Sequence, residues 1–542
     1  MMRVGVYAQS GPQGASIADH ASKGGEWKKM HLDEKPLFRG AYLSLTLFLC
    51  GATVLVVEII GARMVSSYFG SSIYVWSSLI TVTLVSLALG YWLGGSYAER
   101  RPGATSMYDV VLTAAASLIA VPLLRAPVLG LFAPLGIRAG SFLAVIALFM
   151  LPLFLLGMVT PCAIGLASGR STAVAALTGR LYAISTLGSV VGALASGFLL
   201  VPLIPVDGIV MVFAAFLAAT AAVPFAAGGN YGRAGAALML LILSLVKFLL
   251  PAELPRSGDA AVLFRQNSPY ADIRVIESAS GRSLLANGIM QGSMDRNGFP
   301  ADRYFYSVDT LVRTYRPDTR DTLVIGLGTG AYPKLQYANG LRADVVEIDP
   351  VMRTAAMRYF GFREERGKLY VQDGRDYLRS TEKKYDCVFI DVYTAESLPI
   401  HLFTVESFLL AAGSLKDDGI IAINFHDARD ERKNIASRSV VRTLQAVFRD
   451  VRAFEVQIWH DASIANTVFL ASRRPLILKG TYTPFQVSGM PVNAPVPLPV
   501  SVVGSGGLLL TDAFNPLDSL YNPISETMRR ATIQAFSPGL LL

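Results

Sequence analysis

The sequence predicts a multi-pass α-helical membrane domain of about seven spans, followed by a small antiparallel β unit and a doubly wound α/β domain. Of the 542 residues, 52% are hydrophobic and only 16% are charged, and long apolar stretches crowd the first half. That balance is too apolar for a soluble enzyme. After residue 321, short strands alternate with helical patterns, which predicts the α/β domain. The predicted boundaries are 1–38 (tail), 39–254 (membrane domain), 258–305 (β unit) and 306–542 (α/β domain).

The composition argues against several classes of protein. Residues 1–38 are polar and poor in apolar runs, so we expect a disordered tail. The net charge of +8 is not gathered into a dense basic stripe, so we expect no nucleic-acid partner. The 3 cysteines lie far apart and the 5 histidines lack metal-ligand spacing. We therefore expect neither a disulfide framework nor a metal site.

Seven apolar stretches make up the predicted membrane domain. Each approaches the roughly 20 helical residues that cross a bilayer, which is the expected partner of this half. Small residues recur at helix-packing intervals, as in "GSVVGALASG" (188–197). Glu58, inside the first stretch, is either a functional group or the partner of Arg63 in a structural ion pair. The stretches are 41–61, 73–98, 107–124, 139–167, 181–204, 208–227 and 234–251.

Loop charges predict the orientation of these spans. If seven spans alternate, most basic residues fall on the side of the N-terminus, which the positive-inside rule assigns to the cytoplasm. An odd number of spans then places the C-terminal half on the opposite side. The basic residues on the N-terminal side are Lys28, Lys29, Lys35, Arg39, Arg100, Arg101, Arg170, Arg180 and Arg233; those on the other side are Arg63, Arg125 and Arg138.

The C-terminal half begins with "VLFRQNSPYADIRVIES" (262–278) and "RSLLANGIMQGS" (282–293), β-branched runs separated by turn residues, which predict a small antiparallel unit. The strands predicted beyond it alternate with helices and imply a parallel sheet covered on both faces. They are "DTLVIGL" (321–327), "ADVVEID" (343–349), "KLYVQDG" (368–374), "YDCVFIDV" (385–392), "GIIAINF" (419–425) and "NTVFLAS" (466–472).

A glycine-rich turn follows the first of these strands. Gly326, Gly328 and Gly330 let the backbone turn tightly and approach a ligand without a Cβ in the way. The next strand ends about 20 residues later in Glu347, whose carboxylate can accept hydrogen bonds from both hydroxyls of a ribose. Together, the turn and the acidic strand end predict a nucleotide site.

Two further strands end in carboxylates. Asp373, followed by Gly374, can accept a hydrogen bond from an adenine amino group; the alternative is a solvated loop residue, which the series of acidic strand ends makes less favoured. Asp391 falls at the carboxyl edge of the sheet, where such folds keep their ligands. A carboxylate placed there could accept a proton from an attacking amine.

These residues carry a resemblance to a known family. The chain resembles the bacterial membrane-fused spermidine synthase-like proteins, which join a multi-pass membrane domain to a Rossmann-like aminopropyltransferase domain. The resemblance covers nearly all of the chain after residue 40. The shared motifs are "EIIGARMVSSYFGSSIYVWSSL" (58–79), "GRLYAISTLGSVVGALASGFLLVPLI" (179–204), "YDCVFIDVYTAESLPIHLFTVESF" (385–408) and "LLTDAFNPLD" (509–518).

The resemblance implies a reaction and roles for individual residues. The donor would be decarboxylated S-adenosylmethionine, a co-substrate rather than a prosthetic group, and the acceptor a diamine such as putrescine. Methylthioadenosine would be released, and a homodimer is expected. Glu347 would bind the ribose, Asp373 and Gly374 the adenine, and Asp391 would be the general base. The residues implied to close the donor and polyamine pocket are Gln266, Tyr270, Gln291 and Tyr306.

The chain departs from the family pattern at two places. Thr329 stands where soluble relatives have an aspartate for the donor's aminopropyl ammonium, and no replacement is apparent in the sequence. Thr394 stands where they have an aspartate for the acceptor amine, and Glu396 is the candidate replacement. His401, in the same loop, is read either as a proton carrier or as a residue that packs its ring, and the second reading is favoured.

Three functions are compatible with these residues. The first is a membrane-bound aminopropyltransferase of polyamine (spermidine) biosynthesis. The second is an S-adenosylmethionine-dependent methyltransferase, favoured by the missing aspartate at Thr329. The third is a polyamine transporter or sensor with a non-catalytic nucleotide-binding domain. For the first, we expect a bacterial inner-membrane protein with a cytoplasmic catalytic domain, because the donor is made in the cytosol; the seven-span count conflicts with that side.

Overall fold

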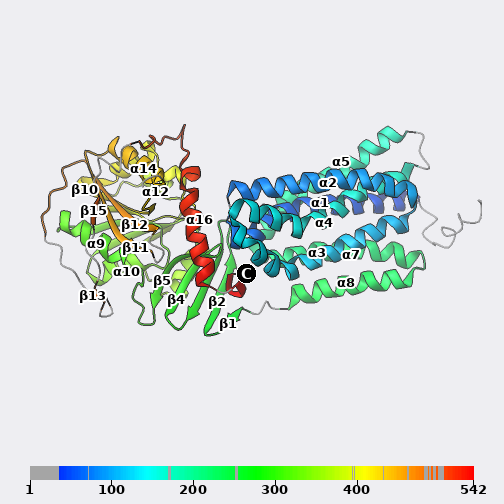
Figure 1. Ribbon diagram of the computed structural model, residues 1–542, viewed down its shortest axis with the longest axis horizontal. Coiled ribbons are helices and arrows are strands. Elements are labelled where there is room, and N and C mark those ends of the chain that lie inside the picture. Colours follow the sequence, from blue (N-terminus) through cyan, green and yellow to red (C-terminus); the bar gives the residue numbers. More distant parts are fainter. Residues whose placement is uncertain are drawn as a thin grey trace, which may run out of the picture.

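The structure is a computed structural model with two halves, an all-helical half and a mixed α/β half (Figure 1). It describes residues 36–70, 72–168, 173–250, 254–393, 395, 397–430, 433–459, 463–480, 486–487, 490–491, 496–498, 506–536 and 538–541. The predicted tail therefore lies almost wholly outside the described residues. Thr394 and Glu396 also lie outside them.

The first half consists of long apolar helices. Within the described residues, six helical stretches are long and apolar enough to cross a membrane by length and composition. The longest, Ala104–Ser168, is 65 residues long and contains two helices that pack against each other. The elements are α1 (Pro36–Phe69), α2 (Ile73–Arg100), α3 (Ala104–Phe132), η2 (Ala133–Leu135), α4 (Gly136–Ser168), α5 (Val174–Ala195), η3 (Ser196–Leu200), α6 (Val201–Leu203), α7 (Val206–Ala227) and α8 (Tyr231–Leu249).

Glycines bring these helices into close contact. A Cβ built on Gly188 of α5 would lie 2.0 Å from the carbonyl oxygen of Phe48 in α1. A Cβ on Gly51 of α1 would lie 2.0 Å from the carbonyl oxygen of Ser185. The predicted small-residue segment 188–197 thus begins at a backbone contact that any side chain would break.

The second half begins with an antiparallel sheet in which each strand pairs with the next along the chain. Its strands are β1 (Arg256–Ser257), β2 (Ala260–Asn267), β3 (Asp272–Ser278), β4 (Gly281–Ala286) and β5 (Ile289–Asp295). The turn between β4 and β5 is Asn287-Gly288, both with positive φ, as a tight hairpin requires.

Among the residues that the structure describes, eight strands form one mixed sheet in the order β15-β11-β12-β10-β9-β6-β7-β8. The strands are β6 (Asp321–Ile325), β7 (Arg342–Glu347), β8 (Leu369–Val371), β9 (Tyr385–Ile390), β10 (Leu415–Ala428), β11 (Asp450–Ile458), β12 (Ile464–Ser472) and β15 (Val496–Leu498), and β13 (Gln486–Val487) pairs with β14 (Met490–Pro491). The helices are α9 (Tyr304–Tyr315), α10 (Ala331–Ala338), α11 (Pro350–Tyr359), α12 (Gly374–Ser380), η4 (Ile400–Leu402), α13 (Val405–Gly413), α14 (Ile435–Gln445), α16 (Leu517–Ala535) and α17 (Pro538–Leu541).

The prediction of a parallel sheet is wrong for one part of this sheet. Strands β8, β7, β6, β9 and β10 are parallel, but β12, β11 and β15 are antiparallel to their neighbours. Only the short segment 459–463 connects β11 to β12. A connection of that length joins antiparallel strands, because a parallel crossover needs a dozen or more residues.

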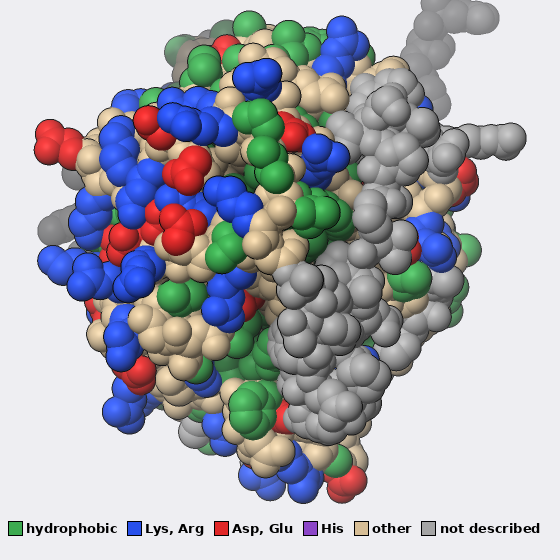
Figure 2. Space-filling view, turned by 90° about the vertical axis from the view of Figure 1, so that its left-hand side faces the viewer, with side chains coloured by type: hydrophobic (Ala, Val, Ile, Leu, Met, Phe, Trp, Pro, Cys, Tyr) green, Lys and Arg blue, Asp and Glu red, His purple; other side chains and the backbone are tan. Residues whose placement is uncertain are grey.

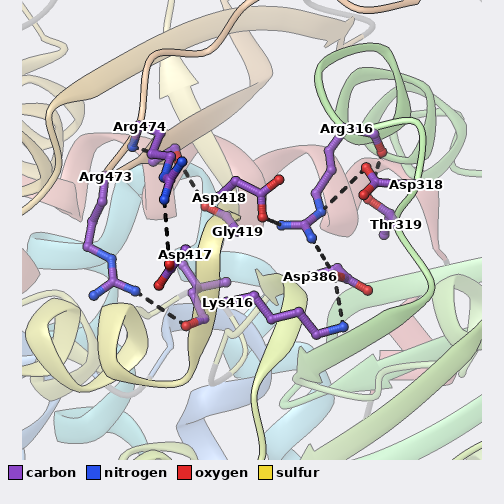
Figure 3. Close-up of polar contacts among 12 residues, drawn as sticks. Arg316, Asp318, Thr319, Asp386, Lys416, Asp417, Asp418, Gly419, Arg473 and Arg474 are labelled. Carbon is purple, nitrogen blue, oxygen red and sulfur yellow. Dashed lines mark hydrogen bonds and ion pairs between the residues drawn. The ribbon is translucent and has the colours of Figure 1, made fainter.

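Ion pairs lock the amino-terminal edge of the parallel strands (Figure 3). The carboxylate of Asp386, at the start of β9, lies 2.6 Å from Arg316 and 3.0 Å from Lys416. It also accepts hydrogen bonds from the backbone N–H groups of Arg320 and Asp321, at the start of β6. Arg316 pairs in addition with Asp418 at 2.7 Å. This network ties β6, β9 and β10 together on the edge opposite the strand ends that the sequence analysis singled out.

The two halves meet through α16, which lies between them and crosses the end of the helical half (Figure 1). Arg529 in α16 is buried and donates to the backbone carbonyls of Ser67, at the end of α1, and Asn287. Arg63 in α1 donates to the carbonyls of Ser268 and Pro269, each at 2.8 Å. These bonds replace the ion pair with Glu58 that the sequence suggested as one reading. The far end of the α/β half carries interspersed basic and acidic side chains (Figure 2).

Candidate active site

A cavity of about 910 Å³ lies at the carboxyl edge of the eight-stranded sheet, between this sheet and the small antiparallel sheet. It opens beside the neighbouring strands β6 and β9. From β6 the parallel strands continue outward to β7 and β8, and from β9 they continue in the opposite direction to β10. Open α/β sheets bind their ligands at such a switch point. The ends of β6, β7 and β9 and the loop after β8 all contribute lining residues.

The glycine turn after β6 forms one wall. Gly326, Gly328 and Gly330 have φ values of 97°, 52° and 76°. A Cβ on Gly326 would lie 2.0 Å from the carbonyl oxygen of Asp391, so only glycine fits there. Gly326 and Gly328 line the cavity. Gly330 does not; it starts α10 and packs against Phe362.

Glu347, the last residue of β7, lines the cavity and is held by backbone donors. Its Oε2 accepts from the N–H of Leu327 at 3.0 Å, and its Oε1 accepts from the N–H of Asp349 at 2.9 Å. Burial raises the pKa of Glu347 to about 7 although these hydrogen bonds favour the charged form. The bond to Leu327 fixes the carboxylate against the glycine turn.

Asp373 caps α12 at the end of β8. Its Oδ1 accepts from the N–H groups of Arg375 and Asp376, and its Oδ2 lies 2.9 Å from Nε2 of His401. Burial alone would raise the pKa of Asp373, but the bonds from His401 and the backbone outweigh it and hold that pKa below its usual value. Asp373, Gly374 and His401 all line the cavity, so the structure favours a site position for His401 over a ring packed away in the loop.

The closing motif is attached to this same region. Both oxygens of Asp512 accept from Arg375, at 2.8 and 2.5 Å, and one accepts from Thr404 at 2.9 Å. Arg375 also donates to the carbonyl of His401 at 3.3 Å. Asp512 therefore clamps the start of α12 to the loop that carries His401, although Asp512 itself does not line the cavity.

Asp391 follows β9 and lies on the other side of the glycine turn. Its Oδ2 accepts from the hydroxyl of Tyr304 at 2.8 Å, and its Oδ1 accepts from the side-chain amide of Asn424 at 2.9 Å. Asn466 in β12 donates in turn to Asn424 at 3.0 Å, which fixes the amide orientation. Burial raises the pKa of Asp391 to about 6, with a smaller contribution from the charge of Asp302. A carboxylate so placed is ionised near neutral pH and basic enough to take up a proton.

The residues predicted to close the pocket are only partly brought together. Tyr270 and Gln291 line the cavity, and Gln291 donates to the carbonyl of Ala395 at 3.0 Å. Gln266 is exposed and does not line the cavity. Tyr306 is buried and, like Gln266, does not line the cavity. Tyr304 lines the cavity, and residues two apart on a helix point to nearly opposite sides.

Sequence reasoning missed several lining residues, among them Tyr304, Asn424 and Asp302. Asn424 sits in a predicted strand near its carboxyl end, so the argument that found Asp391 could have found it. Tyr304 and Asp302 come from the connection between the two sheets, where the sequence carries no comparable positional signal. Within the described ranges, no three or more His, Cys, Asp or Glu side chains form a metal-binding group.

Comparison with known proteins gives a consistent picture. Residues 308–471 match the family model of the spermine/spermidine synthase domain. An N-terminal histidine N-methyltransferase of Emericella nidulans is 35% identical over 139 residues, which cover 25% of this chain and 24% of that protein. A polyamine aminopropyltransferase of Vibrio vulnificus is 29% identical over 199 residues, which cover 34% of this chain and 66% of that protein. The chain thus spans less than two thirds of the length of either relative.

A solved structure of a probable spermidine synthase from Corynebacterium glutamicum is 18% identical with a TM-score of 0.38, covering 48% of this chain and 97% of that one. The match to the family model spans the glycine turn, Glu347, Asp373 and Asp391. The C-terminal part of this chain carries a spermine/spermidine synthase domain, preceded by a region of apolar helices.

Proposed function

We propose that the protein is a membrane-bound aminopropyltransferase that transfers an aminopropyl group from decarboxylated S-adenosylmethionine to a diamine such as putrescine. The main support is that Glu347, Asp373 and Asp391 line one cavity at the switch point of the sheet. The first two would hold the ribose and the adenine, and Asp391 would face the acceptor nitrogen. The polyamine aminopropyltransferases among the relatives support the same reaction.

The chemistry needs positioning and one proton acceptor. The acceptor amine attacks the donor carbon next to the sulfonium, a C–N bond forms, and the C–S bond breaks with its electron pair left on sulfur. Methylthioadenosine leaves as a neutral thioether. Asp391 takes the proton that the attacking nitrogen loses, while Tyr304 and Asn424 keep the carboxylate in place.

Product analysis of the purified full-length protein tests this proposal. The protein is incubated with labelled decarboxylated S-adenosylmethionine and a panel of diamines. We expect release of methylthioadenosine together with a labelled polyamine. Binding without product, unaltered by Asp391→Asn, would instead indicate a sensor or transporter.

Methyl transfer is the second candidate, and Thr329 favours it. This side chain is 2% exposed, lies in the glycine turn and offers no charge to a donor ammonium. The relative from Emericella nidulans is named a methyltransferase. Release of S-adenosylhomocysteine from intact S-adenosylmethionine, with no turnover of the decarboxylated donor, would establish methyl transfer and exclude the first proposal.

We further propose that the helical half crosses the bilayer seven times. The stretch Ala104–Ser168 would be roughly three times as long as the ~30 Å hydrocarbon core if it were one straight helix. It is interrupted at η2 and Gly136, whose φ is 77°, and α3 packs back along α4. Two crossings by this stretch and one by each of the other five give seven.

The proposed location is the bacterial inner membrane, with the catalytic half in the cytoplasm, where the donor is made. The charge distribution opposes this side, because Arg100, Arg101, Arg180 and Arg233 lie at the helix ends remote from the catalytic half. A compartment-sensitive reporter fused to the C-terminus decides between the two sides, and a signal only outside the cytoplasm would overturn the proposal. We also propose a homodimer, to be measured by light scattering in detergent.

A further inference from the structure

Asp302 is a carboxylate of the cavity that the reaction described above does not use. It lies between β5 and α9 and lines the cavity. Its Oδ2 accepts from the N–H of Ser293 at 2.9 Å and from the hydroxyl of Ser293 at 3.4 Å. Burial raises its pKa despite these bonds. Among the residues that the structure describes, the hydrogen bonds to Asp302 come from Ser293, a neutral donor.

The position of Asp302 is set by Gly292 and the glycine turn. A Cβ built on Gly292 would lie 3.2 Å from Cγ2 of Thr329 and 3.7 Å from Oδ2 of Asp302, so these two side chains flank the same point of the backbone. Thr329 is buried and does not line the cavity, whereas Asp302 does. The charge of Asp302 also acts on Asp391 and on Tyr304. Asp302 is therefore close both to the turn and to the reacting centre.

The proposed donor carries a cation that needs such a partner. With its adenosine between Glu347 and Asp373 and its reacting carbon facing Asp391, the donor would carry the positively charged ammonium of its aminopropyl arm inside the same cavity, which Asp302 also lines. A buried ammonium without a counter-charge is strongly disfavoured. Asp302 is the cavity carboxylate next to the turn that is held only by neutral serine donors.

We propose that Asp302 binds the aminopropyl ammonium of the donor. This inference rests on the proposed function and names the residue that recognises its donor. The carboxylate comes from the loop before α9 rather than from the turn itself, where Thr329 leaves no charge.

Binding measurements with two nucleotides test the proposal. Methylthioadenosine matches the donor but lacks the aminopropyl arm, so it serves as the internal control. Calorimetry on the full-length protein is expected to show that Asp302→Asn raises the Kd of decarboxylated S-adenosylmethionine by about 10- to 100-fold. This is the usual range for losing a charged hydrogen bond. The Kd for methylthioadenosine is expected to change less than about twofold. Asn can still accept from the N–H of Ser293, so the hairpin is retained.

Two variants act as controls. Asp302→Glu keeps the charge and is expected to preserve most of the preference for the donor over methylthioadenosine. Asp417→Asn, at an 87% exposed carboxylate on the opposite edge of the sheet, is expected to change neither constant.

Other outcomes would overturn the assignment. If Asp302→Asn raises the Kd of the donor and of methylthioadenosine equally, Asp302 has a structural role and does not recognise the ammonium. An unchanged donor Kd with a raised KM for the diamine would assign Asp302 to the acceptor. If Asp302→Glu and Asp302→Asn lose the preference for the donor over methylthioadenosine equally, the charge of Asp302 does not recognise the ammonium. A wild-type protein that binds intact S-adenosylmethionine but not its decarboxylated form would refute the proposed function itself, whatever Asp302 does.

Discussion

The two edges of the central sheet treat their carboxylates in opposite ways. At the amino edge, Asp386 is almost fully buried but lies within 3.0 Å of both Arg316 and Lys416, and Arg316 also pairs with Asp418 (Figure 3). At the carboxyl edge, Glu347 is buried and Asp391 is half-buried, and both are held by neutral donors: backbone N–H groups, a tyrosine hydroxyl and an asparagine amide. One edge is neutralised internally, and the other keeps negative charge facing a cavity.

This difference explains why some carboxylates at strand ends stabilise the fold and others are available to a ligand. An internally paired carboxylate has its charge compensated before any ligand arrives, so it contributes to the fold. A carboxylate held by neutral donors keeps its capacity to interact with a cation or to take up a proton. The raised pKa values of Glu347 and Asp391, against the lowered pKa of Asp386, express that contrast. The four variants and conditions below test it, from the largest expected effect to the smallest.

Asp386→Asn tests the structural edge. Removing this carboxylate leaves Arg316 and Lys416 without their shared buried partner, and breaking a buried pair costs about 3–5 kcal/mol. We expect a clear fall in the melting temperature of the full-length protein in detergent, with unchanged donor affinity in the folded fraction. The exposed Asp417→Asn is the matched control and is expected to cost less than about 0.5 kcal/mol. Equal melting temperatures for the two variants would contradict the structural role.

Asp391→Asn tests the catalytic edge. We expect turnover to fall by at least about 100-fold through loss of the base, equivalent to about 2.7 kcal/mol. The melting temperature is not expected to fall, because the substitution removes a buried charge whose pKa is already raised. Single-turnover assays with labelled donor measure the rate, and circular dichroism on heating measures stability. Turnover at the wild-type rate would exclude Asp391 as the base.

The pH dependence of turnover follows from the same carboxylate. The pKa of Asp391 lies at about 6, above its usual value, so the group is ionised at pH 8 and protonated progressively below pH 6. Only the ionised form can accept a proton, so the rate is expected to fall as pH falls, by about fivefold between pH 6 and pH 5 and by about tenfold between pH 8 and pH 5. The residual rate of Asp391→Asn should not show this fall between pH 8 and pH 5. A wild-type rate that is flat down to pH 5 would contradict this assignment.

Much of the catalytic edge follows from the sequence because of strand periodicity. An apolar run that ends in a carboxylate fixes where the carboxylate emerges, and parallel strands bring their carboxyl ends to one edge. Glu347, Asp373 and Asp391 were found in this way. The paired edge was not predicted, because Asp386 and Arg316 are 70 positions apart and only the sheet brings them together.

Other features depend on information that one sequence does not carry. Gln266 and Tyr306 were assigned by resemblance, and the structure directs Tyr304 rather than Tyr306 toward Asp391. Asp302 reaches the cavity only through the packing of the small sheet against the glycine turn. The antiparallel β11 and β12 follow from a short connection that the strand pattern alone did not reveal. Tertiary packing decides the first two of these features, and the length of a connection decides the third.

The smallest expected effect concerns the link between the helical half and the catalytic edge. Arg63 in α1 holds the backbone of Ser268, whose hydroxyl donates to Asp349 at 2.6 Å, and the N–H of Asp349 donates to Glu347. Arg63 thus acts as a positioning residue, because it reaches Glu347 only through other groups.

We expect Arg63→Ala to raise the Kd of the donor and of methylthioadenosine together, by about three- to tenfold, the cost of one or two hydrogen bonds. The rate of the bound complex should change little, because Asp391 and its partners Tyr304 and Asn424 are outside this chain of contacts. Arg233→Ala is the control. Arg233, at the start of α8, forms a partly exposed ion pair with Asp109, and its removal should leave the Kd of both nucleotides unaltered. If Arg63→Ala binds both nucleotides as tightly as the wild type, the helical half anchors the enzyme without shaping its donor site.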